Sequence, residues 1–498
     1  MRPTNVLFIF SDQHSRRVLG CYGNPVARTP NLDRLAAAGT RFRSAYCQTP
    51  ICVPSRASLA TGRWAHAIDS WDNATPYTGT EAPSWGHRLT LQGHKVTTIG
   101  KLHYRKVDDP SGFPDQRVPM HVLEGVGDLY GLLRGDMPVR PQSREQVLEA
   151  RAGESEYTRY DRAIAEMSAR WLREEAPEER KPWCLFVGFI TPHFPLVVPD
   201  RYWTLYPPDS LPLPVQYAPE HWSRHPVLEL KRRQEALDSP FDEATIRNAL
   251  RAYYGMVTFL DEQIGIVLAA LRQAGLGETT RIIYSTDHGE MLGEHGLWWK
   301  SAMYESAVAV PLIVAGADVP RGHVVGTNAM LVDVFPAIVD AVGARPAPDD
   351  RDLPGESLWT LAREGDRPRV AFSEYHAIFS PSGIFMIRTA RYKYVHYVGS
   401  PPQLFDMIDD PEETRDLAGT REHAEALRGC RQALRAICDP DLVDRRAKAD
   451  QRRRLEAAGG VEAVIASGVK IPYTPAPAEF DPAPVEARER AKHLESSR

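Results

Sequence analysis

Four short runs of apolar residues, most of them β-branched or aromatic, stand out along the chain. They span residues 6–10, 184–190, 281–285 and 310–314. Continuous runs of this length predict strands that are buried on both faces of a sheet. Between them, residues 160–172 and 250–271 carry apolar side chains at helical spacing, which predicts helices packed on that sheet. Strands that alternate with helices indicate an α/β fold.

Polar residues follow three of these predicted strands. Asp12 and Gln13 come shortly after the first, His193 after the second, and Asp287 and His288 after the third. In open α/β sheets, ligands bind beyond the carboxyl ends of the strands. We therefore expect these side chains to converge on one site.

The hydrophobic pattern changes near residue 368. Residues 370–373, 384–388 and 392–397 show the partial alternation of antiparallel strands, and residues 421–438 are suited to a helix. The end of the chain is basic and then rich in proline and alanine, a composition that does not predict a core of its own. We predict a large domain over residues 1–368, a small α+β domain over 369–440 and an arm over 441–498. The arm either packs on a partner subunit or is a loosely ordered tail.

Composition narrows the functional classes. The 498 residues are 43% hydrophobic and 25% charged, as in ordinary soluble proteins, and the net charge of -5 argues against a nucleic-acid binder. The apolar run at residues 6–10 is too short to span a membrane and has no signal-peptide pattern, so we expect a cytoplasmic protein without membrane association. Six widely spaced cysteines do not suggest a disulfide framework.

The segment from Cys52 to Arg63 carries the most specific signal. It reads Cys-Val-Pro-Ser-Arg-Ala-Ser-Leu-Ala-Thr-Gly-Arg and resembles the signature of the sulfatase family, whose cysteine is oxidised to formylglycine. Taken alone, Cys52 is more simply read as an inert buried thiol. The resemblance implies an alkaline-phosphatase-like fold, in which a large mixed sheet lies between helices and a smaller α+β domain follows. It also implies a formylglycine-generating enzyme as a maturation partner.

Formylglycine would give residue 52 a chemistry that serine lacks. One hydroxyl of the hydrated aldehyde can attack sulfur, and the other can expel sulfate as the aldehyde re-forms. Arg56 would lie near the diol and the oxyanion, where its charge favours the alkoxide.

The same resemblance implies a divalent metal ion at the hydrated aldehyde. Asp12, Gln13, Asp287 and His288 resemble the family's metal ligands. Many members have aspartate at the position of Gln13 and asparagine at that of His288. Hard oxygen ligands suit Ca²⁺, while an imidazole nitrogen suits transition metals, so Ca²⁺ and Mn²⁺ both stay open. An isolated Asp-His pair could equally be a helix cap or a surface turn.

Two further segments resemble family motifs that act on the sulfuryl group. Gly100-Lys101-Leu102-His103 is similar to a Gly-Lys-x-His motif, and Lys300 matches a later lysine. By resemblance, His103 would assist collapse of the sulfated intermediate. Lys101, Lys300 and His193 would hold the sulfuryl group or stabilise the leaving alkoxide. Singly, each is more simply read as a solvated lysine or a hydrogen-bonded histidine.

A finer resemblance points to the subgroup of choline sulfatases and phosphonate monoester hydrolases. It rests on Asp72-Asn73, Ser373-Glu374-Tyr375-His376, Arg391–Tyr394 and Gln403–Asp406. It implies substrate contacts from Asn73 and Glu374, although Glu374 could instead sit in a local ion pair. A choline site needs an aromatic cage, and residues 118–134 contain a single aromatic, Tyr130. This argues against choline sulfate.

We therefore predict a sulfatase that hydrolyses a small-molecule sulfate monoester and forms a homo-oligomer, a dimer or a tetramer. One alternative is hydrolysis of a phosphonate monoester or phosphodiester by the same residues, because tetrahedral phosphorus and sulfur anions share their geometry. Another is a non-catalytic anion-binding protein in which Cys52 stays unmodified.

Overall fold

A twisted eight-stranded sheet forms the centre of the computed structural model, which describes residues 2–135, 137–468 and 473–480. Its strand order is β11 (His323–Val325), β2 (Gly39–Phe42), β10 (Ile313–Gly316), β9 (Thr280–Thr286), β1 (Asn5–Ser11), β7 (Cys184–Gly188), β4 (Val96–Lys101) and β5 (Asp115–Met120). The strands from β9 to β5 run parallel, and β10 pairs antiparallel with β9 and β2. The sheet is therefore mixed, as expected from the sequence.

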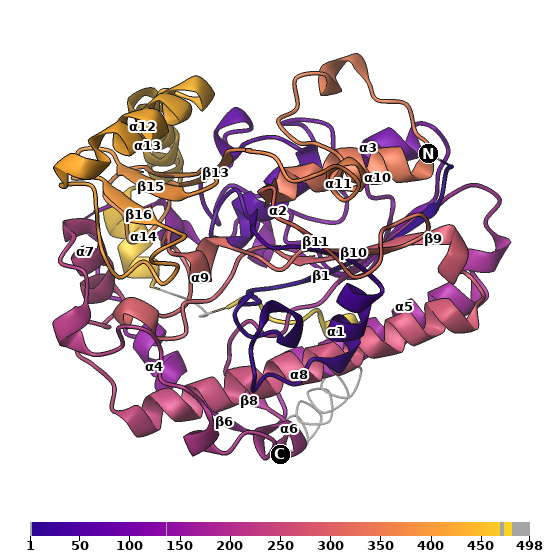
Figure 1. Ribbon diagram of the computed structural model, residues 1–498, viewed down its shortest axis with the longest axis horizontal. Helices are drawn as coiled ribbons and strands as arrows, with labels where there is room; N and C mark the ends of the chain where they lie inside the picture. The colour runs from indigo at the N-terminus through magenta and orange to yellow at the C-terminus, as the bar shows by residue number, and fades with distance from the viewer. Residues whose placement is uncertain (1, 136, 469–472, 481–498) are drawn as a thin grey trace, which may run out of the picture.

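Helices cover both faces of this sheet (Figure 1). On one face lie α1 (Pro30–Ala37), α5 (Glu156–Glu174) and α8 (Glu243–Gln273); on the other lie α2 (Cys52–Thr61), α3 (Trp85–Thr90) and α10 (Val334–Val342). Strand β1 explains this layering, because Leu7 and Ile9 enter the core on the first face while Phe8 and Phe10 enter the core on the second. Both faces of the strand are thus buried.

The long helix α8 has the length and hydropathy of a membrane span. However, 72% of its most apolar window is buried inside the protein. Leu260, Ile264 and Val267 belong to the core beneath the sheet. These contacts are those of a core helix.

A second, four-stranded antiparallel sheet follows the large one. It consists of β13 (Ala371–Tyr375), β14 (Ile384–Arg388), β15 (Tyr392–Tyr397) and β16 (Gln403–Asp406), and α12 (Ala424–Ile437) and α13 (Pro440–Ala457) pack on it. Buried Lys393 on β15 lies 2.7 Å from the Glu413 carboxylate and 3.3 Å from that of Glu305 in α9 (Glu305–Val308). This ion-pair cluster ties the small sheet to the large domain.

Shorter elements complete the chain. They are β3 (Ala45–Tyr46), α4 (Gln142–Leu148), β6 (Arg151–Ala152), β8 (Val197–Val198), α6 (Asp200–Trp203), α7 (Pro226–Gln234), β12 (Ala329–Met330), α11 (Leu358–Leu361) and α14 (Val461–Ser467).

The elements predicted from the pattern are present, with shifted boundaries. The predicted helices at 160–172 and 250–271 lie inside α5 and α8, and the strand predicted at 310–314 begins only at Ile313. Residues 441–468 of the predicted arm form most of α13 and all of α14, and Val443 and Ala447 pack in the core of the small sheet. Packing of the arm on a partner subunit stays a prediction.

Candidate active site

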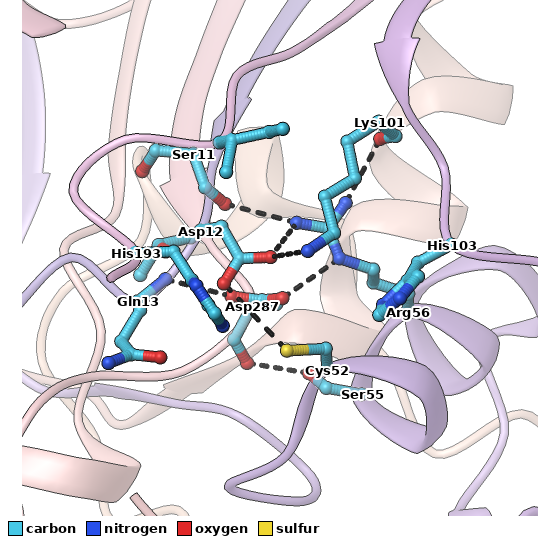
Figure 2. Close-up of polar contacts among 12 residues, drawn as sticks. Ser11, Asp12, Gln13, Cys52, Ser55, Arg56, Lys101, His103, His193 and Asp287 are labelled. Atoms are coloured by element: carbon cyan, nitrogen blue, oxygen red, sulfur yellow. Dashed lines mark hydrogen bonds and ion pairs between the residues drawn. The ribbon is translucent and has the colours of Figure 1, made fainter. Parts of the chain in front are cut away.

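Four parallel strands deliver their following residues to one edge of the large sheet. The register pairs Phe10 with Ser285 and Ser11 with Thr286, so Asp12 and Asp287 leave neighbouring strands at the same level. Lys101 ends β4, and His193 follows β7. The convergence expected from the sequence is therefore present (Figure 2).

Two cations clamp the Asp12 and Asp287 carboxylates. Arg56 Nη2 donates to Asp12 Oδ2 at 2.9 Å and Arg56 Nε donates to Asp287 Oδ2 at 2.8 Å, while Lys101 Nζ lies 2.7 Å from Asp12 Oδ2 (Figure 2). Burial alone would raise the pKa of Asp12, but the charges of Lys101 and Arg56 outweigh it and hold that pKa well below its ordinary value. Asp12 is thus an anion in a fully buried position.

Cys52 is the first residue of α2 and faces these groups. Its Sγ lies 3.2 Å from His288 Nε2, 3.7 Å from Asp12 Oδ1 and 3.8 Å from Lys300 Nζ. The positive end of the helix dipole favours negative charge at this position. Burial, followed by the charge of Asp12, raises the pKa of the Cys52 thiol to about 12. An unmodified thiol here is protonated and a poor nucleophile.

Asp12, Cys52, Asp287 and His288 form a candidate metal centre. One ligand atom from each lies within 4.8 Å of all the others. Two ligands of one Ca²⁺ lie at most about 4.6–5.2 Å apart, twice the metal–oxygen distance, so these atoms fit around a single divalent cation.

The imidazole of His288 is also prepared for a metal. Its Nδ1 lies 3.0 Å from the carbonyl oxygen of Gly289, which can only accept, so Nδ1 carries the proton. Burial first, with Lys300 adding to it, lowers the pKa of His288. The neutral ring therefore turns the lone pair of Nε2 toward Cys52.

Gln13 completes this group from a left-handed backbone conformation, with φ of 63°. Its backbone N–H donates to Asp287 Oδ1 at 3.1 Å. Its side-chain Oε1 accepts a hydrogen bond from Lys300, and its Nε2 donates to Glu290. The amide oxygen thus faces the site from the side of Lys300.

Above Cys52 opens a cavity of about 350 Å³, whose wall includes all the residues predicted to act on the sulfuryl group: Cys52, Lys101, His103, His193 and Lys300. His193 Nδ1 donates to the carbonyl of Phe194 at 2.7 Å, and its Nε2 accepts from Lys300 at 3.0 Å. Burial and the nearby lysines lower the pKa of His193 well below its ordinary value. His193 is therefore neutral and holds Lys300 beside Cys52.

Aromatic side chains from several separate segments line the rest of the cavity: Tyr130, Tyr157, Phe194, Trp299, Phe379 and Tyr473. Phe194 packs on Trp299 with ring centroids 4.7 Å apart, and Tyr157 on Tyr473 at 5.2 Å. Most of the aromatic residues of the cavity therefore come from outside residues 118–134, the segment on which the argument against choline sulfate was based.

Asn73 lines the cavity in which its substrate contact was predicted, whereas Arg56 does not face that cavity. Asn73 lines the cavity, and its Oδ1 accepts from the backbone N–H of Val53, so it also caps α2. Arg56 is 1% exposed and lies behind Asp12 and Asp287. Arg56 is not one of the described residues that line the cavity, because its guanidinium binds the two carboxylates.

Glu374 corrects the sequence interpretation. It is fully buried, and within the described part of the chain it does not belong to the cavity wall. Its carboxylate accepts from the backbone and Nδ1 of His66, at 3.0 and 2.9 Å, and lies 2.9 Å from His376 Nε2. The substrate contact expected of Glu374 is therefore wrong, and the local ion pair is what the structure contains.

Three supporting residues escaped sequence reasoning. The Asp161 carboxylate accepts from the backbone N–H groups of Ile190 and Thr191 and so fixes the loop that carries His193. Thr474 Oγ1 lies 3.1 Å from His103 Nε2. Glu290, three residues after Asp287, could have been noticed as a carboxylate next to the metal ligands, whereas nothing in the proline-rich tail distinguished Thr474.

Two protein-family models together match most of the chain. A family model described as Sulfatase matches residues 4–344, which is more than half of the chain. A second model, described as N-sulphoglucosamine sulphohydrolase, C-terminal, matches residues 293–439.

Individual proteins resemble the chain over most of its length. A choline-sulfatase of Rhizobium meliloti (strain 1021) is 30% identical over 481 residues, covering 90% of this chain and 90% of that protein. Arylsulfatase K of Bos taurus is 30% identical over 467 residues, covering 87% and 81%. Among solved structures, the phosphonate monoester hydrolase from Silicibacter pomeroyi superposes with a TM-score of 0.69 at 26% identity, covering 87% of this chain and 95% of that one.

Proposed function

Because the chain belongs to the sulfatase family and is a sulfuric ester hydrolase, we propose that residue 52, converted from cysteine to formylglycine, attacks the sulfur of a sulfate monoester. As a hydrated aldehyde, this residue supplies one hydroxyl for attack and a second for the release of sulfate. The observation that carries the proposal is the position of Cys52 between a candidate metal centre and the cavity.

The raised thiol pKa supports a modified rather than a native cysteine. A thiol whose pKa is about 12 is almost entirely protonated at neutral pH. Its neighbours Asp12, His288 and Lys300 are polar, which is not the apolar setting of an inert core cysteine. A protein that only binds an anion would not need the carboxylates of Asp12 and Asp287 beside the thiol, because their negative charge repels an anion.

The remaining residues of the wall have distinct tasks in this proposal. Lys300, held by His193, and Lys101 neutralise the equatorial oxygens of the sulfuryl group as negative charge develops. His103 lies in the wall and, with its Nε2 at Thr474, assists proton transfer during release of sulfate. The apolar and aromatic part of the cavity receives the leaving group.

Asp12, Gln13, Asp287 and His288 would hold one divalent cation, which acts as a Lewis acid when bound. Ca²⁺ and Mn²⁺ are the two candidates. Metal analysis of the purified protein, followed by removal with a chelator and re-addition of each ion, distinguishes them. The ion that restores hydrolysis at the lower concentration is the resident ion.

The first experiment is mass spectrometry of the peptide that contains Cys52, after co-expression with a formylglycine-generating enzyme. We expect the aldehyde in place of the thiol, and Cys52→Ala should abolish turnover of an aryl sulfate. An unmodified thiol in a fully active preparation would overturn the proposal.

Phosphonate monoester or phosphodiester hydrolysis is the second candidate, because solved phosphonate monoester hydrolases share the fold. Rates measured in parallel on an aryl sulfate, choline sulfate and a phenyl phosphonate monoester distinguish sulfate ester hydrolysis from phosphonate hydrolysis. We expect the highest kcat/KM for a sulfate ester, and a strong preference for the phosphonate would contradict this choice. Homo-oligomerisation and a cytoplasmic location stay predictions from the sequence.

A further inference from the structure

We propose that Glu290 is a positioning residue, which fixes the Gln13 amide with its oxygen toward the candidate metal centre and holds the backbone that carries Lys300. Glu290 is 1% exposed and lies in the loop after β9. Its two carboxylate oxygens have different partners. Oε2 accepts from Gln13 Nε2, and Oε1 accepts from the backbone N–H groups of Leu292 at 2.9 Å and Trp299 at 2.6 Å.

The orientation of the Gln13 amide follows from the chemistry of its two neighbours. Both Glu290 oxygens lie at donors, Oε1 at two backbone N–H groups and Oε2 at the amide nitrogen of Gln13, so this side chain faces Gln13 as an acceptor. The ammonium group of Lys300 only donates, so it requires the amide oxygen. Both neighbours therefore select one of the two amide orientations, the one in which oxygen is available to a cation.

Glu290 acts on Lys300 as well as on Gln13. Leu292 and Trp299 have positive φ values of 50° and 66°, which residues other than glycine adopt only at a cost in free energy. Their backbone N–H groups point at the same Glu290 oxygen, so this carboxylate stabilises the loop in the shape that delivers Lys300. Glu290 is thus connected to Lys300 in two ways: through the side chain of Gln13, and through the backbone of Trp299, the residue before Lys300.

This inference rests on the proposed function, in which Gln13 is a metal ligand. Glu290→Gln keeps the size of the side chain. Its single amide oxygen is needed as the acceptor for the N–H groups of Leu292 and Trp299. Its new amide nitrogen then faces Gln13, whose amide turns over and presents nitrogen to the cation. We expect Mn²⁺ and Ca²⁺ to bind about 10–100-fold more weakly, as is usual when a group supporting a metal ligand is lost.

A second substitution restores the pattern of donors and acceptors. In the Gln13→Glu/Glu290→Gln double variant, one oxygen of the new carboxylate accepts from residue 290 and the other faces the cation. We expect metal binding to recover. Gln13→Glu alone makes two carboxylates face each other, and we expect it to weaken binding.

The measurement is equilibrium dialysis of each metal against the full-length chain, with thermal denaturation to follow folding. Glu294→Gln is the matched control, because Glu294 is a partly buried acid of the same loop but pairs with Arg17 at 3.6 Å and with Ser306. If the unsubstituted protein binds neither metal, the proposed function fails. If it binds and Glu290→Gln binds equally well, or if the double variant is no better than Glu290→Gln, the inference about Glu290 is wrong.

Discussion

Lys300 contacts three groups of the site at once. Its ammonium lies at the Gln13 amide oxygen, 3.0 Å from His193 Nε2 and 3.8 Å from Cys52 Sγ. It is 9% exposed and belongs to the cavity wall. Such a cation accelerates the reaction to the extent that it stabilises charge developing in the transition state more than charge already present in the substrate.

Lys300→Ala should lower kcat for an aryl sulfate by about 10²–10³, as expected when one preorganised group facing a developing oxyanion is removed. The measurement is steady-state kinetics on preparations matched for metal content and for modification of residue 52. Lys106→Ala, an exposed lysine outside the cavity wall, is the control. Near-normal turnover of Lys300→Ala would rule out the role.

The pair formed by His66 and Glu374 makes a prediction about pH. Although burial opposes it, Glu374 raises the pKa of His66 above 6.5, and the two histidines hold the pKa of Glu374 far below 4.5. The contribution from His66 is complete below pH 6.5 and is lost as pH rises through its folded pKa. That from Glu374 is complete above 4.5 and is lost as pH falls through its folded pKa.

His66→Gln should therefore lower the free energy of unfolding most between pH 4.5 and pH 6.5. We expect a loss of about 1.5–3 kcal/mol, typical for a hydrogen bond to a charged group. Urea unfolding at about pH 6 and about pH 9 checks the sign, because the loss should be smaller at the higher pH. A loss that grows with pH would contradict the ion pair.

Among the elements, the buried parallel strands were the most predictable from the sequence. Residues 6–10 form an uninterrupted apolar run, and Ile282, Ile283 and Tyr284 form a shorter one, because both faces of β1 and β9 are covered by helices. Strand β4 was missed because Thr97 and Thr98 interrupt its apolar run, although both are buried. Helix α13 was missed because its sequence is mostly charged and it buries only a narrow stripe.

The site was predictable where chemistry lies in short motifs after strands. Asp12, Asp287 and His288 were found because they follow predicted strands, and Cys52 and Lys101 because their segments resemble motifs of the sulfatase family. Roles that depend on orientation could not be read from sequence. Arg56 lies behind the carboxylates and Glu374 lies away from the cavity, because packing of α2 and of the small sheet decides which buried groups each side chain meets.

The segment of residues 473–480 reaches the site from the far end of the chain. Tyr473 lines the cavity, Thr474 contacts His103, and Tyr157 OH donates to the carbonyl of Thr474 at 2.5 Å. A chain ending at Gly468 should therefore lose at least about tenfold in kcat/KM, which corresponds to about 1.4 kcal/mol.

A chain ending at Phe480 retains these contacts and is the matched control for that truncation. Both chains are compared by kinetics on an aryl sulfate and by thermal denaturation. Equal activity of the two would show that the segment only covers the cavity. A finer test is Thr474→Val, which removes the hydroxyl near His103 and leaves the fold of the segment intact.

For the whole molecule, the site joins residues from position 12 to position 474, so it exists only once nearly all of the chain has folded. Cys52 is then 2% exposed at the bottom of the cavity. We therefore expect an enzyme that oxidises this cysteine to act before the segment around it has folded. With formylglycine at position 52 as proposed, the yield of active protein would depend on whether oxidation precedes folding, and slower synthesis at lower temperature should raise the oxidised fraction.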